Sequence, residues 1–352
     1  MTKYYTRACN FFYGKLSKKL VKKKITLPLA GNKEISFDKL EIFSKSEKKI
    51  SSIIVDIKKI KSLPKKVKTK VVTDIKKIIS GRKFLNKKKH KLMGILNMTP
   101  DSFSDGGKFN NKNKALSQIS KMIDSGADII DIGGESTRPE SKIIPSKIEW
   151  KRVSWIIEKF KKKFPKVLLS VDTRKSLVIK NAIKNKADII NDVSCFKFDK
   201  EIYKEIKNRN LWKVIHHMQG TPQTMQINPK YNHVILEIYD FFEKEINKLK
   251  KDDYSNQIIL DPGIGFGKNL KHNLMILNKI SIFHSLGFPV LIGTSRKRFI
   301  NQISKNFDTK ERLGGTLSSI LFSLSQGVQV FRVHDVREVK QGILVFENLL
   351  NK

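Results

Sequence analysis

The stretch LMGILNMTPDSFSDGG, residues 92–107, decides the fold of this chain. Its apolar run from Leu92 to Leu96 is typical of a buried strand, which ends at the polar Asn97 and opens into a loop rich in Pro, Asp, Ser and Gly. Strand-like runs that also end in polar residues recur along the chain, at 92–97, 128–132, 167–171, 188–191, 213–217, 258–260, 289–292 and 328–333. Such repetition is typical of a parallel barrel, whose reactive face is built from the ends of its strands.

Helical patterns, such as those at 115–126, 148–160 and 233–249, lie between the strand-like runs. Consecutive parallel strands need crossover helices of this kind, and an eightfold barrel takes about 250 residues. The alternative is a doubly wound open sheet, which usually carries a Gly-rich dinucleotide turn, and no GxGxxG motif opens the first unit. We therefore predict an α/β chain with a TIM-like (β/α)8 barrel over residues 92–352.

Residues 1–91 have a different pattern, and we predict a small basic appendage of mixed α and β structure there. Alternation and β-branched residues predict strands at 35–43 and 50–60, and the apolar spacing predicts a helix at 67–80. Residues 1–33 contain no acid, which would also fit a mitochondrial transit peptide, although such peptides favour Arg and Ser over Lys.

The charge of the chain is strongly basic, with a formal net charge of +38 over 352 residues. Residues 1–91 alone hold 28 Lys and Arg residues against 6 Asp and Glu residues. Three explanations are open: nucleic-acid binding, steering of an anionic substrate, or a lysine-rich composition without a partner. Because base-reading contacts favour Arg and Lys greatly exceeds Arg here, we favour compositional bias with some steering over a nucleic-acid partner.

Several classes of protein do not fit the composition. No apolar run is long enough to cross a bilayer, and no signal-peptide core opens the chain, so we expect no membrane association. Cys9 and Cys195 are the only cysteines, which indicates two reduced thiols in a cytoplasmic protein. Neither a CxxC nor an HExxH spacing occurs, which argues against a structural zinc site.

Polar residues follow all eight predicted strands. They are Asn97; Glu135, Thr137 and Arg138; Asp172 and Thr173; Asn191 and Asp192; His216 and His217; Asp261 and Lys268; Ser295, Arg296 and Lys297; and Arg332, His334 and Asp335. A Ser-His-Asp order with a nucleophile elbow is absent, and neither cysteine lies beside a rim histidine, so covalent catalysis is not expected. Lys297 could form a Schiff base, but next to Arg296 it would suit an anion or a carbonyl equally well.

The types of residue on this rim indicate a ligand. Asp172, Asn191 and Asp261 suit a planar heterocycle, because a carboxylate accepts two parallel N–H bonds, although Asp172 and Asp192 could instead cap helices. Arg332 and His334 follow the last strand, near the usual phosphate site of such barrels. Asn97 offers a neutral oxygen suited to a Mg²⁺ ion that phosphates already bind.

At these residues the chain closely resembles the dihydropteroate synthase family. The matching motifs, in the order of the family, are MGILNMTPDSFSDGG (93–107), GGESTRP (133–139), SVDT (170–173), IINDV (189–193), HMQGTPQTMQ (217–226), DPGIGFGK (261–268), TSRK (294–297) and FRVHDV (331–336). The resemblance implies a TIM-like barrel and a transferase. Its substrates would be 6-hydroxymethyl-7,8-dihydropterin diphosphate and 4-aminobenzoate, with Mg²⁺ as cofactor, and the enzyme would be a homodimer.

The resemblance also implies roles for single residues. Pterin binding falls to Asp172, Asn191, Asp261 and Lys297; Mg²⁺ binding to Asn97; diphosphate binding to Arg332 and His334; loop closure to Phe103, Asp105, Thr137 and Arg138; and contact with 4-aminobenzoate to Phe266 and Lys297. We expect Asp105 to stabilise the cationic methylene carbon once the first loop closes. The chain departs from the family at His216, where an apolar residue is usual, and this puts a polar group at the edge of the pterin pocket.

Two rival functions fit parts of the sequence. A corrinoid-type methyltransferase domain shares the barrel and the pterin-binding Asp and Asn positions, but it would not need the TSRK and FRVHDV motifs. A catalytically silent binder of nucleic acid would have no reason to keep Asn97, Lys297 and Arg332 together. Residues 1–91 lie outside the resemblance and show no motif of a fused pterin aldolase or pyrophosphokinase.

Overall fold

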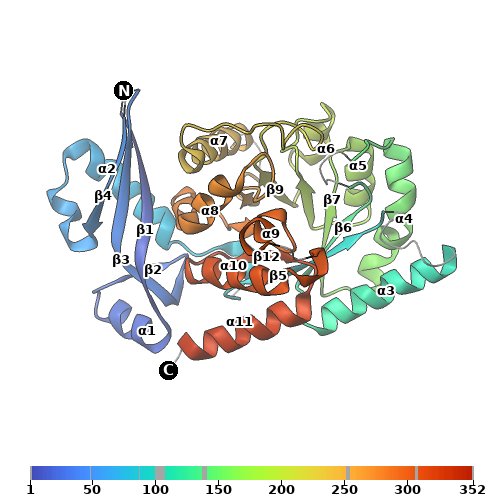
Figure 1. Ribbon diagram of the computed structural model, residues 1–352, viewed down its shortest axis with the longest axis horizontal. Coiled ribbons are helices and arrows are strands. Elements are labelled where there is room, and N and C mark those ends of the chain that lie inside the picture. The colour runs from blue at the N-terminus through green and yellow to red at the C-terminus, as the bar shows by residue number, and fades with distance from the viewer. Residues whose placement is uncertain are drawn as a thin grey trace.

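The computed structural model describes residues 2–47, 49–86, 88–99, 108–136, 141–250, 254–305 and 308–350. It shows a barrel with helices around it and a smaller sheet from the N-terminal residues that packs against one side of the barrel (Figure 1). No helix in these ranges is long and apolar enough to span a membrane.

Eight parallel strands of the described chain form the barrel sheet, in the order β10-β9-β8-β7-β6-β5-β12-β11. A parallel bridge between Leu260 and Val290 closes the remaining gap between β10 and β11. The strands are β5 (Lys91–Asn97), β6 (Ile129–Gly133), β7 (Leu168–Asp172), β8 (Ile189–Asp192), β9 (Trp212–His216), β10 (Ile258–Asp261), β11 (Leu291–Ile292) and β12 (Val330–Val333). The predicted (β/α)8 barrel is therefore confirmed.

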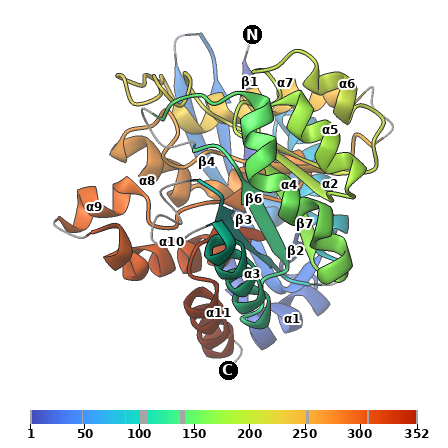
Figure 2. The same cartoon turned by 90° about the vertical axis from the view of Figure 1, so that its right-hand side faces the viewer.

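Helices follow the barrel strands and cover the outside of the sheet (Figure 2). They are α3 (Lys108–Asp124), α4 (Ser146–Lys163), α5 (Ser176–Lys184), α6 (Ile202–Ile206), α7 (Val234–Leu249), α8 (Leu270–Asn278), α9 (Arg298–Ser304), α10 (Leu313–Ser325) and α11 (Val336–Leu350), with the 3-10 helices η4 (Ile280–Leu286) and η5 (Thr309–Glu311). The main hydrophobic core lies between these helices and the outward faces of the strands.

The interior of the barrel holds a second apolar cluster at the amino ends of the strands. It contains Met93, Ile129, Ile189, Val214, Ile259, Leu291 and Val330, together with Phe84 and Leu85, which precede β5 in the chain. Side chains alternate across a strand, so the residue two or four positions after each of these also points inward. Asn97, Asp131, Asn191, His216, Asp261 and Arg332 occupy those positions, and the alternation therefore carries polar groups to the carboxyl end of the interior.

The N-terminal residues form a four-stranded antiparallel sheet in which β1 and β4 both pair with the long β3. Its elements are β1 (Lys3–Tyr13), α1 (Gly14–Lys22), β2 (Leu27–Leu29), β3 (Asn32–Lys45), β4 (Ile50–Asp56), η1 (Ile57–Ser62), α2 (Lys65–Ile79) and η2 (Lys83–Leu85). Neither β1 nor α1 was predicted. The predicted strand at 50–60 is wrong beyond Asp56, because that carboxylate accepts the backbone N–H of Lys58 and starts a 3-10 helix.

This sheet contacts the barrel through both rings and charges. The rings of Tyr5 and Tyr239 pack edge to face with centroids 5.1 Å apart. Asp240 accepts hydrogen bonds from the Lys3 ammonium at 2.7 Å and the Tyr5 hydroxyl at 2.9 Å. Part of the basic charge of residues 1–91 is thus neutralised by acids of the barrel.

Candidate active site

The strand register brings most of the predicted site residues to one level of the barrel. Asn97 lies opposite Gly133, which lies opposite Asp172, and Asp172 lies opposite Asn191 on the next strand. On the far side, Asp261 lies opposite His216. Since strand ends of a parallel barrel meet on one face, these residues surround a common space, as the sequence predicts.

The floor of this space is a network centred on Asp131, which is completely buried on β6. Arg332 donates from Nε to the Oδ2 atom of Asp131 at 2.7 Å and from Nη2 to the Oδ2 atom of Asp172 at 2.8 Å. The amide of Asn191 also donates to Asp131, at 3.1 Å. Sequence reasoning missed Asp131, although a lone acid within the apolar run IIDIG was a usable signal.

Arg332 is therefore oriented toward the floor by two carboxylates, which engage two of its three guanidinium nitrogens. The alternative that Asp172 caps a helix is wrong, because α5 has Lys175 at its N-cap position and no side-chain cap. Asp192 instead accepts the backbone N–H groups of Ser194 and Phe196 and so shapes the loop after β8.

Two polar atoms of the floor have no partner among the described residues. They are Oδ1 of Asp131 and Oδ1 of Asn191. A buried acceptor without a donor is costly, so the floor holds more hydrogen-bond acceptors than the described chain satisfies.

Burial also changes the titration of the floor carboxyls. It raises the pKa of Asp172, with Arg332 opposing the change and the neighbouring Asp131 adding to it. Burial likewise raises the pKa of Asp261, whereas the charge of Lys297 lowers it. Perturbed carboxyls in a cleft are typical of binding and catalytic sites.

Lys297 closes the side of the space nearest to Asp261. Its ammonium donates to the carbonyl of Ile264 and lies 4.5 Å from the ring centroid of Phe266. Burial lowers the pKa of Lys297 to about 8, and Asp261 opposes that change. The ring of His216 packs edge to face on Phe266 with centroids 4.6 Å apart, and burial lowers the His216 pKa well below its usual range. His216 is thus a neutral wall residue.

The glycine-rich loop after β10 owes its position to close contact with the loop after β9. Gly263 has φ +67°, and a Cβ atom there would overlap the carbonyl oxygen of His217. Only glycine adopts this backbone without strain. Beneath the loop, the buried Lys268 donates to the carbonyl of Phe266 at 2.8 Å and contacts Nδ1 of His217 at 3.0 Å. Both Lys268 and His217 were predicted at the rim, but neither was assigned a role in binding or catalysis.

The end of β12 is held by the loop after β11. The hydroxyl of Ser295 lies 3.0 Å from Nδ1 of His334 and accepts the backbone N–H of His334 at 3.2 Å. Arg296 forms a bidentate pair with Asp335. These contacts orient His334 beside Arg332, which the sequence predicts as a pair.

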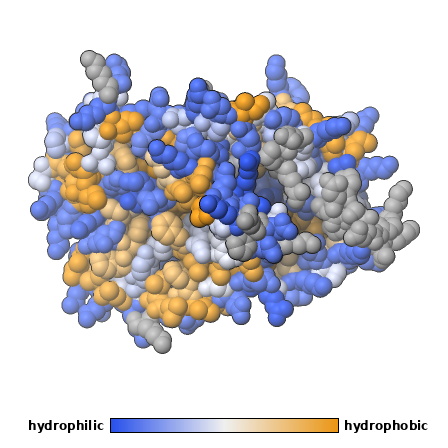
Figure 3. All heavy atoms as spheres, in the orientation of Figure 1, coloured by the Kyte–Doolittle hydropathy of each residue, from blue (hydrophilic) through white to orange (hydrophobic). Residues whose placement is uncertain are grey.

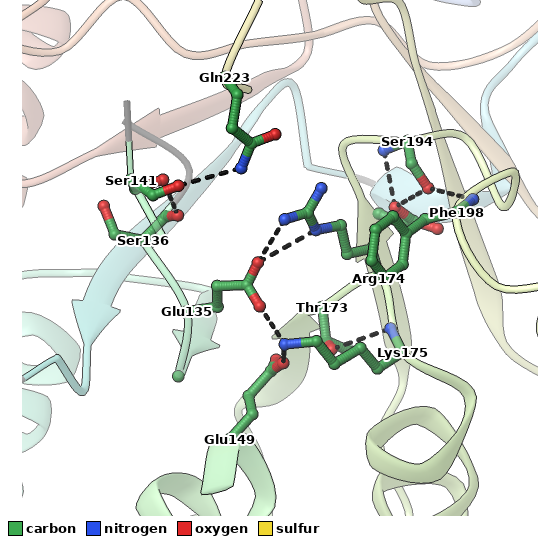
Figure 4. Close-up of polar contacts among 12 residues, drawn as sticks. Glu135, Ser136, Ser141, Glu149, Thr173, Arg174, Lys175, Ser194, Phe198 and Gln223 are labelled. Carbon is green, nitrogen blue, oxygen red and sulfur yellow. Dashed lines mark hydrogen bonds and ion pairs between the residues drawn. The ribbon is translucent and has the colours of Figure 1, made fainter. Parts of the chain in front are cut away.

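A charge cluster, formed by Glu135, Glu149, Arg174 and Lys175, anchors the loop after β6 (Figure 4). Arg174 donates to Oε1 of Glu135 at 2.5 Å, and the Lys175 ammonium bridges Glu135 and Glu149, the latter at 2.6 Å. All four side chains are buried. Two carboxylates face two cations here, so the cluster is balanced in charge.

Two further hydrogen bonds hold the described ends of the same loop (Figure 4). The Ser141 hydroxyl donates to the carbonyl of Ser136 at 2.6 Å, and the amide of Gln223 donates to the carbonyl of Ser141 at 3.0 Å. The loop after β9 therefore holds the point where the chain re-enters the described structure at residue 141. Thr137 and Arg138, the predicted second-loop residues, lie outside the described residues, as do Phe103 and Asp105 of the first loop.

The part of the chain that the structure describes contains no group of three or more His, Cys, Asp or Glu side chains that could hold a metal ion. Asn97 is the predicted ligand, and it lies at the carboxyl end of β5, partly exposed at the rim. One amide oxygen fits Mg²⁺ only as a supplement to other oxygen ligands, since the ion takes six and usually keeps water and phosphate oxygens.

Comparison with known proteins gives a consistent result. The chain matches the family described as pterin binding enzyme over residues 93–334. It is 40% identical over 261 residues to the dihydropteroate synthase of Escherichia coli K12, which covers 74% of this chain and 92% of that protein. The crystal structure of the Yersinia pestis dihydropteroate synthase with a sulfonamide drug complex superposes with a TM-score of 0.69 at 37% identity, covering 75% of this chain and 95% of that one. The Xanthomonas albilineans enzyme in complex with 7,8-dihydropteroate superposes with a TM-score of 0.66 at 30% identity, covering 74% and 94%.

Proposed function

Because this chain belongs to the dihydropteroate synthase family, we propose that the rim of its barrel is the place where the reaction of that family occurs. The chain is a transferase of folate synthesis: it condenses 6-hydroxymethyl-7,8-dihydropterin diphosphate with 4-aminobenzoate, releases diphosphate and forms 7,8-dihydropteroate. The observation that supports the location is the single level on which Asn97, Asp172 and Asn191 lie across neighbouring strands.

The pterin is assigned to the floor of the barrel. Its ring edge carries several N–H donors, and the floor offers the carboxylates of Asp172 and Asp261, beside which the buried Oδ1 atoms of Asp131 and Asn191 have no donor in the described chain. Charge-assisted bonds to buried carboxylates are the strong ones. Lys297 is proposed to donate to a ring carbonyl of the pterin, and this role is supported by its ammonium, which already donates to the backbone carbonyl of Ile264 beside Asp261.

The diphosphate is assigned to the side of Arg332 and His334. Arg332 uses Nε and Nη2 for Asp131 and Asp172, so the guanidinium keeps further N–H donors that are proposed to bind phosphate oxygens. Ser295 fixes the ring of His334 next to it. Holding charge in advance of the reaction costs no reorganisation when the leaving group separates.

The bond change is a displacement at the methylene carbon of the pterin. The neutral arylamine nitrogen forms the new C–N bond, the C–O bond to diphosphate breaks with its electron pair leaving on oxygen, and the amine proton is lost to water or to a leaving oxygen. The side chains of the chain bind, orient and exclude water rather than form covalent bonds. Phe103, Asp105, Thr137 and Arg138 are proposed to complete the enclosure, with Asp105 facing the cationic methylene carbon.

Mg²⁺ is proposed to bind to Asn97 together with the diphosphate. When bound, the ion would neutralise charge that builds up on the leaving group. Asn97 supplies the neutral oxygen, and the acids of the floor lie one strand or more away on β6 and β7.

A homodimer is proposed on the basis of an exposed apolar face. Phe322 on α10 and Leu344, Val345 and Leu349 on α11 are exposed, and Figure 3 shows apolar side chains gathered over this region. Patches of this kind mark interaction sites.

A cytoplasmic location is proposed because the two cysteines, Cys9 and Cys195, are free and buried. The absence of a nucleic-acid partner stays a prediction.

The test is an assay of diphosphate release by the full chain. Release should require both the pterin diphosphate and 4-aminobenzoate, and chelation of Mg²⁺ should suppress it. Release that proceeds at the same rate without 4-aminobenzoate would show hydrolysis instead of condensation. Release that is unaffected by a chelator would reject the assignment of Mg²⁺ to Asn97.

A further inference from the structure

Two loops at the carboxyl end of the barrel meet backbone to backbone. They are the loop after β9, residues 217–233, and the loop after β10, residues 262–269. A Cβ atom on Gly263 would overlap the carbonyl oxygen of His217, and one on Gly267 would overlap the backbone of Gln219. The two loops are therefore in direct contact at both ends of the glycine-rich turn 263–267.

Lys268 links these two loops from the inside. Its side chain is only 2% exposed. Nζ donates to the carbonyl of Phe266 at 2.8 Å in one loop and to the carbonyl of His217 at 3.2 Å in the other, and it lies 3.0 Å from Nδ1 of the His217 ring. The carbonyl of His217 is also the group against which Gly263 packs. Lys268 thus bonds both loops at the place where they touch.

The contacts of Lys268 are complete without a carboxylate. An ammonium group has three N–H donors, which match the two carbonyl oxygens and Nδ1 of His217. A neutral amine has two N–H donors for the carbonyls and a lone pair for an N–H at Nδ1. Burial lowers the pKa of Lys268 well below its usual range, although the charge of Asp261 opposes this change. Since both forms satisfy the same three contacts, the bridge avoids the cost of a buried polar group without partners.

The bridge fixes the backbone of Phe266, whose ring lies at the site. The carbonyl of Phe266 accepts the bond from Lys268, and its backbone N–H donates to the carbonyl of Gly263 at 3.0 Å. The ring packs edge to face on His216 with centroids 4.6 Å apart, and its own centroid lies 4.5 Å from the ammonium of Lys297. A shift of this backbone would move the ring relative to both neighbours, and a misplacement of about 1 Å is enough to reduce turnover strongly.

Two further donors from the loop after β9 hold the same turn. Nε2 of Gln226 donates to the carbonyl of Gly265 at 2.9 Å, and the hydroxyl of Tyr231 donates to the carbonyl of Gly267 at 2.8 Å. Gln226 is exposed and Tyr231 is partly exposed. The bond to residue 266 itself comes from a buried side chain, and a hydrogen bond is stronger away from water.

We propose that Lys268 is a positioning residue for 4-aminobenzoate: together with His217 it holds the Phe266 ring where that ring contacts the aryl ring of the substrate. This inference rests on the proposed reaction and on the predicted contact between Phe266 and 4-aminobenzoate. Lys268 acts through Phe266 and touches neither substrate. Asp172 and Asn191 of the pterin floor lie on the neighbouring strands β7 and β8, so pterin binding does not depend on the bridge.

The test is the variant Lys268→Met, which keeps the length of the side chain and removes all three contacts. In the diphosphate-release assay of the full chain, KM for 4-aminobenzoate should rise about tenfold. The dissociation constant of the pterin diphosphate, measured by titration calorimetry, should change by less than about twofold. Lys271→Met, the same change at an exposed position on α8, should leave both constants as they are. An unchanged KM in Lys268→Met, or an equal loss of pterin binding, overturns the proposal.

A double variant measures whether Lys268 acts through Phe266. Phe266→Leu should raise KM for 4-aminobenzoate by itself. Addition of Lys268→Met to Phe266→Leu should then raise KM by less than about twofold, because residues that act as one unit are not additive. A rise as large as that caused by Lys268→Met alone would mean that Lys268 acts by another route, and this result overturns the proposal.

If Lys268→Met does not fold, His217→Phe takes its place. It keeps an aromatic ring beside Phe241, removes the contact at Nδ1 and leaves both carbonyl bonds, so KM for 4-aminobenzoate should rise about threefold; no rise overturns the proposal. A wild-type chain whose diphosphate release does not depend on 4-aminobenzoate rejects the proposed reaction and this inference together. Wild-type activity with an unchanged KM in the variants rejects this inference alone.

Discussion

The floor of the barrel and the charge cluster of Glu135, Glu149, Arg174 and Lys175 both bury charge at the carboxyl ends of the strands, but they compensate it differently. The cluster sets two carboxylates against two cations through direct contacts. The floor sets the carboxylates of Asp131 and Asp172 against one cation, Arg332. Both regions leave buried acceptors without a partner in the described chain, one in the cluster (Oε1 of Glu149) and two in the floor (the Oδ1 atoms of Asp131 and Asn191). The balanced charges of the cluster suit a part that holds a loop, whereas the excess of acceptors in the floor suits a ligand with N–H donors.

The largest expected effect is on folding, in the variant Lys175→Met. Removal of the ammonium leaves Glu135 and Glu149 buried beside each other with Arg174 as the remaining cation, and breaking a buried pair in this way costs about 3–5 kcal/mol. Urea denaturation measures the loss in the free energy of unfolding. Arg174→Met should cost less, because Lys175 still binds Glu135. A loss for Lys175→Met of only about 0–1 kcal/mol, as for a surface pair, would contradict the account of the cluster.

The next effect is on catalysis, in the variant Asp172→Asn. The amide keeps the shape of the side chain but removes the charge that binds Arg332 and, as proposed, the pterin. Loss of one partner of a buried charged pair costs about 2–5 kcal/mol, so kcat/KM for diphosphate release should fall by about 100-fold or more. Glu201→Gln, the same chemical change at an exposed position on the surface, should leave kcat/KM unchanged. Full activity in Asp172→Asn would show that the Asp172 carboxylate does not bind the pterin.

The third effect is a pH dependence that separates activity from stability at Lys297. Its pKa is lowered from 10.5 to about 8 in the folded chain. Between these two values the unfolded chain binds the proton more strongly, so this group adds stability as pH rises from about 8 to about 10.5. Activity that needs the ammonium should fall over the same range, by about tenfold per pH unit. Lys297→Arg stays charged there, and its kcat/KM profile should lose the decline. The same decline in both proteins would assign it to another group.

The smallest effect is expected for Gln223→Ala, which removes the hydrogen bond to the Ser141 carbonyl and leaves the charge cluster intact. One neutral hydrogen bond contributes about 0.5–1.5 kcal/mol, so turnover should fall by about two- to tenfold, while the free energy of unfolding changes little. Stopped-flow measurement of turnover, alongside urea denaturation, separates the two. A loss of stability as large as in Lys175→Met would show that the loop after β9 is part of the same structural unit as the cluster.

Prediction from sequence succeeded where the signal is local. The apolar runs located all eight barrel strands to within a few residues, and the alternation from Met93 to Asn97 or from Ile259 to Asp261 placed the polar groups at the carboxyl ends. It failed where a segment draws its stability from distant contacts. The strand β1 carries one lysine, one arginine and several aromatic residues without a clear alternation, and Tyr5 is buried where Tyr239 of the barrel packs against it.

Asp131 illustrates the same limit within the site. Its position inside an apolar strand is visible in the sequence, but its partners Asn191 and Arg332 are 60 and 201 residues away. Likewise, the sequence predicts Arg332 as a ligand of diphosphate, whereas its two bonds to Asp131 and Asp172 appear only when the barrel closes.

The sequence by itself determined the barrel and the order of polar groups around its rim, since strand periodicity and loop composition are written in neighbouring residues. Only the tertiary structure decided which charges meet: Arg332 with two aspartates, and Lys175 with two glutamates. The physical reason is that an ion pair forms only when two side chains lie within a few ångströms of each other. The number of residues between the two side chains along the chain does not reveal that distance.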